Sequence, residues 1–254
     1  MHGFQNNGNT CYFNAAVQCL LHVREVSERL LREENITCPF TIAYRELVRV
    51  YFGEKGPLRI DILPLLRQFH EKFPRFKSMW PHDAQEALFC LMDILEPYVK
   101  DVVYGEREQH TVWPSGKKIV KEPYSMLLLH GENGKTVDAL IKTSEEWHTL
   151  TDYVDDAGKK HHVATTRTGI VRFPRVLFVS FDKKARVTAG GVLDRYEVSG
   201  SILHVGSQEG GHYMSMIKSG DAWVLQDDVT LTQVDFPETQ DHHVLMYTLK
   251  NPPS

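Results

Sequence analysis

Three features are scarce or missing in this 254-residue chain, and each absence excludes a class of protein. The four cysteines, Cys11, Cys19, Cys38 and Cys90, form no C-x-x-C pair and are too few and scattered for a disulfide framework. No apolar run approaches the ~18 residues of a membrane-spanning helix, and the N-terminus MHGFQNNGNT lacks an apolar signal region. We therefore expect reduced thiols, no membrane partner and a cytosolic or nuclear protein.

An excess of positive charge is also missing. Lysine and arginine number 29 against 33 aspartates and glutamates, which gives a formal net charge of -4. The chain therefore has no global basic field that would hold nucleic acid. Its 42% of apolar and 24% of charged residues are typical of a folded protein rather than a disordered one.

The pattern of apolar residues changes near residue 100. Before it, apolar residues recur at three- and four-residue spacing, which predicts helices over 13–31, 42–52, 61–73 and 83–99. After it, strand-like runs alternate with Gly, Asp and Lys clusters: YSMLLL, GIVRF, VLFVSF, YEVSGSILHV, HYMSMIK, AWVLQD and HVLMYTL. We expect an antiparallel second half, with the polar segments 101–120 and 150–168 as loops or long exposed hairpins.

Cys11 lies where the turn residues NNGNT meet the first helical pattern. A helix N-terminus favours the reactive thiolate and should lower the pKa of Cys11 below the free value of about 8.5. The position therefore suggests a nucleophile, although a small buried side chain is the alternative. Cys19, Cys38 and Cys90 keep that second interpretation.

A nucleophilic cysteine needs a base, and His212 opens a strand that is followed by a second strand ending in Asp227–Asp228. A two-residue turn at Ser219–Gly220 would place His212 opposite Asp227, whereas a three-residue turn would place it opposite Asp228. Either carboxylate would orient the imidazole, as the third member of a catalytic triad does. An acidic pair at a hairpin end, opposite a histidine by chance, is the alternative.

Three further groups have plain structural interpretations. Asp83 and Glu86 have the spacing of a helix-capping arrangement, and Asn6 begins a good turn sequence with Asn7 and Gly8. Gly210–Gly211 allows positive φ or close backbone approach, and an ordinary turn would use the same residues.

Three segments in order, GFQNNGNTCYFNAAVQCLL, HDAQEALFCLMDILE and YEVSGSILHVGSQEGGHYMSMIKSGDAWVLQDDVTLTQV, resemble the Cys box, the QQDAQEF-type helix and the His box of the ubiquitin-specific proteases. The resemblance implies an α+β, papain-like fold with a helical thumb, an antiparallel β palm and β fingers that grip ubiquitin. It implies one catalytic domain over 1–254, with the thumb in 1–100, the fingers, mixed with palm, in 101–168, and mainly palm in 169–254.

The resemblance also implies roles for individual residues. Cys11 would be the nucleophile, His212 the general base and acid, and Asp227 the orienting carboxylate, with Asp228 as a secondary site. Asn6 would stabilise the oxyanion with its side-chain amide.

The remaining implied residues would contact the substrate. Asp83 and Glu86 would face the arginines of the ubiquitin tail, and Gly210 and Gly211 would lie over its diglycine end.

The sequence departs from the family at two places. Many members carry two C-x-x-C pairs that bind zinc at the fingertips, whereas the corresponding stretches here contain only His110, His161 and His162. We expect solvated loop histidines there, no structural metal and no cofactor. Gln226 stands where a large residue such as Phe usually precedes the Asp pair.

The expected activity is hydrolysis of the bond after the C-terminal glycine of ubiquitin through a thioester, by a monomer. A protease for a ubiquitin-like modifier or for ordinary peptides, and a non-catalytic ubiquitin-binding scaffold, are the alternatives. The sequence is compatible with an excised catalytic domain or a small stand-alone enzyme.

Overall fold

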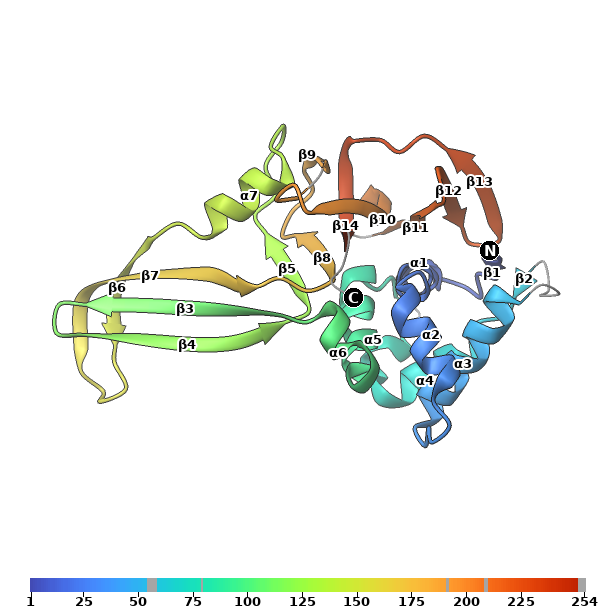
Figure 1. Ribbon diagram of the computed structural model, residues 1–254, viewed down its shortest axis with the longest axis horizontal. Coiled ribbons are helices and arrows are strands. Elements are labelled where there is room, and N and C mark those ends of the chain that lie inside the picture. Colours follow the sequence, from blue (N-terminus) through green and yellow to red (C-terminus); the bar gives the residue numbers. More distant parts are fainter. Residues whose placement is uncertain (54–58, 79, 191, 208–209, 251–254) are drawn as a thin grey trace.

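The structure, a computed structural model, describes residues 1–53, 59–78, 80–190, 192–207 and 210–250. They form three parts in Figure 1: a helical lobe, a central sheet beside it and an arm of two long hairpins that projects away from both. The N-terminus lies where the helical lobe meets the end of the central sheet. None of the helices in these residues is long and apolar enough to span a membrane.

The helical lobe is built around one buried helix. All 11 residues of α1 are buried, because the other helices and strand β11 of the central sheet surround it. A short parallel pair, β1 with β2, fastens the start of the chain to the lobe. The elements of the lobe are β1 (Gly3–Phe4), α1 (Cys11–Leu21), α2 (Arg24–Arg32), α3 (Pro39–Phe52), β2 (Arg59–Ile60), α4 (Leu63–Lys72), the 3-10 helix η1 (Pro74–Lys77), α5 (Ala84–Ile94) and α6 (Glu96–Val103).

The continuous helix predicted over 13–31 is wrong, because the chain breaks at His22–Val23 into α1 and α2. Both helices bury their apolar residues in the same core, so the apolar spacing continues across the break. The hydroxyl of Ser27 donates a 2.8 Å hydrogen bond to the carbonyl of Leu21, one of the carbonyls that a helix end leaves without a helical partner.

The helix predicted over 83–99 is also interrupted. α5 ends at Ile94 and α6 begins at Glu96, with Pro97 in the first turn of α6. Proline has no N–H and its ring clashes with the preceding turn, so one helix cannot continue through this position undisturbed. The helices predicted over 42–52 and 61–73 are confirmed as α3 and α4.

The central sheet has the strand order β13-β12-β11-β10-β14-β8-β5, with β9 paired to β14. It is antiparallel as predicted except between β5 and β8, which run parallel. The sequence pattern did not predict α7 (Val137–Ser144), which packs on the end of the sheet near β5. The strands are β5 (Met126–Leu129), β8 (Val176–Phe181), β9 (Arg186–Thr188), β10 (Tyr196–Ser207), β11 (Gly210–Ser219), β12 (Ala222–Asp227), β13 (Thr230–Val234) and β14 (Thr239–Leu249).

The arm is a four-stranded antiparallel sheet in the order β4-β3-β7-β6, and Figure 1 shows it extending far from the helical lobe. Its hairpins confirm the prediction for the two polar segments. The strands are β3 (Gly105–Trp113), β4 (Gly116–Tyr124), β6 (His148–Val154) and β7 (Lys160–Arg172).

A small cluster closes the far end of the arm. His161 is only 8% exposed, lies 2.8 Å from an Asp155 carboxylate oxygen, and packs its ring against Trp113 and Tyr153. The expectation of a solvated loop histidine is therefore wrong for His161, because aromatic packing removes it from water. His162 is exposed, as expected.

Candidate active site

Cys11 is the first residue of α1, directly after Thr10, which makes no capping hydrogen bond with its side chain. Its thiol is buried and interacts with the backbone of Tyr213 on β11. Burial raises the pKa of the Cys11 thiol, the Tyr213 backbone lowers it, and the negative charge of Asp228 raises it again. The net direction is upward, so the expectation of a lowered pKa is wrong: desolvation outweighs the helix N-terminus.

His212 and Asp227 are brought into direct contact. Nε2 of His212 lies 2.6 Å from Oδ1 of Asp227. The turn between their strands has two residues, as predicted, but it is Gly220–Asp221, and Gly220 adopts the φ of +61° that such hairpin turns require. Ser215 consequently lies opposite Gln226, and His212 reaches Asp227 diagonally across the sheet.

Asp228 fastens the N-terminal segment to the end of β12. Its two carboxylate oxygens accept hydrogen bonds from the side-chain amides of Asn6, at 2.8 Å, and Asn14, at 2.7 Å. The same carboxylate lies 3.9 Å from Nε2 of His212, and the backbone carbonyl of Asp228 accepts from the N–H of Phe4 at 2.8 Å. Asp228 adopts a left-handed φ of +49°, a strain that these contacts hold in place.

The side-chain amide of Asn6 has a fixed orientation. Its oxygen accepts hydrogen bonds from the N–H of Gly8 and from the N–H and hydroxyl of Thr10, while its nitrogen donates to Asp228. An amide nitrogen carries two hydrogens, so a second N–H can be donated to a substrate oxygen.

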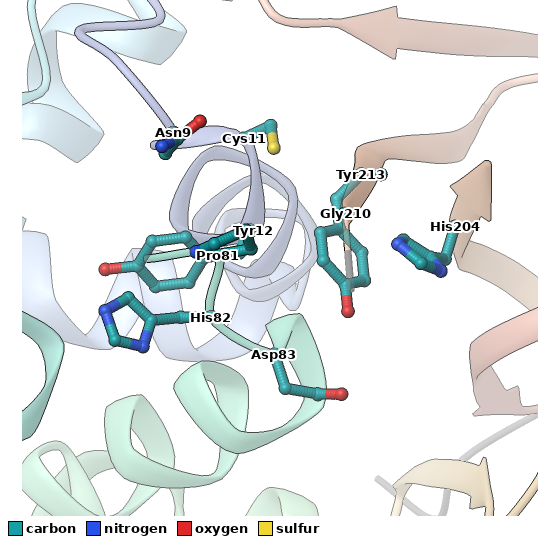
Figure 2. Close-up of a pocket in the computed structure, with 10 residues that line it drawn as sticks. Asn9, Cys11, Tyr12, Pro81, His82, Asp83, His204, Gly210 and Tyr213 are labelled. Atoms are coloured by element: carbon teal, nitrogen blue, oxygen red, sulfur yellow. The ribbon is translucent and has the colours of Figure 1, made fainter. Parts of the chain in front are cut away.

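A groove leads away from Cys11. A hollow of about 170 Å³ beside the thiol is walled by Tyr213 and His204 on one side and by Asp83 below, as Figure 2 shows. A second hollow of about 420 Å³ shares these three walls and continues over the central sheet to Leu128. The two hollows therefore form one path that a polypeptide can follow to the thiol.

Comparison with known proteins places this constellation. The family profile described as "Ubiquitin carboxyl-terminal hydrolase" matches residues 2–189 and 188–247, which is nearly the whole chain. The chain belongs to the ubiquitin carboxyl-terminal hydrolase family. The resemblance to ubiquitin-specific proteases, expected from the three motifs, is thereby confirmed.

Individual relatives cover parts of the chain. Two proteins of Arabidopsis thaliana, ubiquitin carboxyl-terminal hydrolases 1 and 5, are 33% identical over 94 residues and 34% identical over 105 residues. Each alignment covers 36% of this chain, but only 9% and 11% of the respective relative. The chain therefore matches about a tenth of the length of these curated relatives.

Two solved structures cover nearly all of it. The SAGA Ubp8/Sgf11/Sus1/Sgf73 DUB module bound to ubiquitin aldehyde superposes with a TM-score of 0.80 and 17% identity, over 99% of this chain and 70% of that chain. The module bound to monoubiquitin gives 0.81 and 18%, over 99% and 69%. These likenesses confirm the α+β fold of a ubiquitin-specific protease, so the helical lobe, central sheet and arm are called the thumb, palm and fingers below.

The predicted substrate residues of this hydrolase family domain differ in their placement. Asp83 caps α5 by accepting from the N–H groups of Gln85 and Glu86, and it lies 3.1 Å from Nε2 of His243. It also faces the groove. Glu86 instead pairs with Arg75 at 2.7 Å and is not among the residues that line either hollow.

The two predicted glycines both line the first hollow. At Gly211 a Cβ would come within 2.3 Å of Nε2 of His204 and 2.7 Å of the carbonyl of Val205, so only glycine fits there. Gly210 has open space at the same place. The close backbone approach therefore belongs to Gly211.

A metal could contact three of these side chains. In the part of the chain that the structure describes, His212, Asp227 and Asp228 are the one group whose ligand atoms lie close enough together, within 4.8 Å. However, Nε2 of His212 is already bonded to Asp227, and both oxygens of Asp228 already accept from amides. The arrangement therefore suits proton transfer better than ion binding.

Sequence reasoning missed Asn14 and Gln18, which are completely buried in α1, and His243, which contacts Asp83. The first two carried a signal. Polar residues four apart in an otherwise apolar helix lie on one face, and they need buried hydrogen-bond partners there.

Proposed function

We propose that this chain is a thiol-dependent hydrolase that cleaves the peptide or isopeptide bond after the C-terminal glycine of ubiquitin. The observation that carries the proposal is the 2.6 Å contact of His212 with Asp227 on the sheet face that meets the start of α1. A nucleophile, a base and an orienting carboxylate are the minimal set for acyl transfer by covalent catalysis.

The reaction proceeds in two acyl-transfer steps. His212 takes the proton of Cys11, and the thiolate attacks the carbonyl carbon of the terminal glycine. Asn6 and backbone N–H groups at the start of α1 stabilise the negative oxygen, and His212 gives its proton to the leaving amine. His212 then deprotonates a water molecule that attacks the thioester, and Cys11 is released.

The raised pKa of Cys11 assigns a specific task to Asp227. Because burial keeps the resting thiol protonated, the thiolate must form as an ion pair with the His212 imidazolium. Asp227, hydrogen-bonded to the ring, stabilises that imidazolium.

Ubiquitin is the proposed substrate because the groove suits an extended tail that ends in glycine. Gly211 leaves a narrow passage beside the thiol, and the carboxylate of Asp83 can pair with a basic side chain of the tail. The DUB modules that superpose on this chain are bound to ubiquitin aldehyde and monoubiquitin, which supports the choice. We propose a monomer that acts in the cytosol or nucleus.

A ubiquitin probe with a C-terminal electrophile tests the proposal. We expect a covalent adduct through Cys11 and none with Cys11→Ser, whereas a scaffold that only binds ubiquitin would form no adduct. Fluorogenic conjugates of ubiquitin and of ubiquitin-like modifiers then test the substrate. Much faster cleavage of another modifier would overturn the choice of ubiquitin.

A further inference from the structure

A chain of buried polar side chains runs behind the catalytic residues. Ser215 and Gln226 lie opposite each other on β11 and β12, and both are fully buried against the thumb. The hydroxyl of Ser215 lies 3.0 Å from the side-chain amide of Gln18 and 2.8 Å from Oε1 of Gln226. The nitrogen of Gln226 donates to the hydroxyl of Tyr51 at 2.7 Å.

The chain of hydrogen bonds ends at His22, whose Nε2 lies 2.9 Å from the hydroxyl of Tyr51. Burial, together with the positive N-terminal amine and Arg24, lowers the pKa of His22 to about 4. His22 is therefore neutral at physiological pH, and its Nε2 can accept the hydroxyl proton of Tyr51. The buried polar cluster is the set Gln18, His22, Tyr51, Ser215 and Gln226.

The hydrogen bonds of this cluster can all point in a consistent direction. Ser215 carries a single hydroxyl proton, so it donates to Gln226 and accepts from the nitrogen of the Gln18 amide. Gln226 then donates to Tyr51, and Tyr51 donates to His22. Each donor along the path has an acceptor, which is the condition under which a buried polar network orders its surroundings.

The cluster joins the three elements that carry the catalytic residues. Gln18 lies on α1 with Cys11, seven residues further along the same helix. Ser215 lies on β11 three residues after His212, and Gln226 directly precedes Asp227 on β12. None of the five cluster residues lines the two hollows of the substrate groove.

We propose that the buried polar cluster sets the position of α1 relative to β11 and β12, with Gln226 as its central positioning residue. This inference rests on the proposed function. Apolar contacts between a helix and a sheet are non-directional, whereas hydrogen bonds fix distance and orientation. The cluster thereby aligns the Cys11 thiol with the His212–Asp227 pair without contacting the substrate.

The position of Gln226 makes the inference testable. Related proteases carry a large apolar residue before the Asp pair, so an unbranched apolar side chain should be compatible with the fold. Gln226→Met removes the amide and keeps most of the volume. Gln233→Met, on the exposed adjacent strand β13, makes the same chemical change outside the cluster and is the matched control.

We expect Gln226→Met to lower kcat for a ubiquitin–fluorophore conjugate about tenfold or more, because small misplacements of reacting groups are costly. KM should stay within about twofold, since the groove is untouched. Alkylation of Cys11 by iodoacetamide at neutral pH should slow in parallel, since it reports the Cys11–His212 ion pair without any substrate. Gln233→Met should leave all three values unchanged.

Tyr51→Phe provides a second route if Gln226→Met does not fold. It removes one hydroxyl, should lower kcat less than Gln226→Met, and should add little to that variant, because both break the same path. A folded Gln226→Met or Tyr51→Phe with wild-type kcat and alkylation rate would overturn the inference. A wild-type chain that does not cleave ubiquitin would overturn the proposed function instead, and the alkylation rates would still decide the role of the cluster.

Discussion

The thumb–palm junction and the fingers treat polar and apolar side chains in opposite ways. At the junction, amide and hydroxyl side chains such as Gln18, Ser215 and Gln226 are buried and hydrogen-bonded to one another. In the fingers, apolar side chains such as Ile119 and Val163 are 47% and 53% exposed. The chain thus contains one region with directional internal contacts and one with uncovered apolar surface.

The difference indicates a division of labour. Buried hydrogen bonds order the junction, and the catalytic contact of His212 with Asp227 lies on its surface. The fingers are held mainly by strand pairing and by the cluster of His161 with Trp113 and Tyr153 at the tip. We expect variants at the junction to change the chemical step and variants in the fingers to change substrate binding.

The largest expected effect is at the nucleophile. Cys11→Ala should lower kcat/KM by at least about 10⁴-fold, because removing the nucleophile removes the covalent path. Circular dichroism should show an unchanged fold. Cys38→Ser, at a half-buried cysteine away from the groove, should retain full activity, and loss of activity there would show that the assay reports folding rather than chemistry.

The orienting carboxylate comes next. Asp227→Ala should lower kcat about 10³-fold to 10⁴-fold, because the imidazolium loses its hydrogen-bond partner. Steady-state kinetics with a ubiquitin conjugate measures this loss. Near wild-type turnover in Asp227→Ala, combined with a collapse in Asp228→Ala, would transfer the orienting role to Asp228.

Asp228→Ala itself should act mainly through Asn6. Removing the carboxylate releases the Asn6 amide, and losing one oxyanion donor costs about 3 kcal/mol, or roughly 10²-fold in kcat. Asn6→Ala should show a similar loss, and the double variant should be little worse than either single variant. Fully additive losses would mean that the two residues act separately.

The fingers should respond differently. Trp113→Ala removes the ring that packs on Tyr153 and His161, so we expect faster hydrogen exchange in the tips of β3 and β7. KM for ubiquitin should rise by roughly threefold to tenfold with kcat unchanged, because only ground-state binding is affected. Val163→Ala, at an exposed position of the same sheet, is the control. A fall in kcat with unchanged KM would contradict the division of labour.

Local signals predicted most of the individual elements. The helix start at Cys11, the cap at Asp83 and the two-residue turn before β12 all follow from neighbouring residues. Contacts across long sequence separations were not predictable. Asn14 and Asp228 are 214 residues apart, and nothing near Asn14 indicates its partner.

Context also overrode local chemistry in two places. The helix N-terminus predicts a lowered pKa for Cys11, but burial raises it. A polar hairpin predicts solvated histidines, but aromatic packing at the tip of the fingers buries His161. Both outcomes depend on surfaces that exist only after the chain has folded.

The smallest expected effect lies at Asp83, where the two regions meet through the substrate groove. Burial alone would raise the pKa of Asp83, but hydrogen bonds from His243 and from the N–H groups of Gln85 and Glu86 offset this, and the pKa lies below its ordinary value. Asp83→Asn keeps a capping side chain and removes the charge. We expect it to lower the free energy of unfolding by about 0.5–1 kcal/mol at neutral pH.

The pH dependence identifies the charge as the cause. A carboxyl group with a lowered pKa in the folded state stabilises the fold above its unfolded pKa of about 3.9, and this contribution disappears as the pH falls through the lowered value. Urea unfolding of wild type and Asp83→Asn should therefore differ at neutral pH and converge in acid. A difference that is the same at every pH would mean that Asp83 contributes through the shape of the cap, and that its charge is available for the substrate tail.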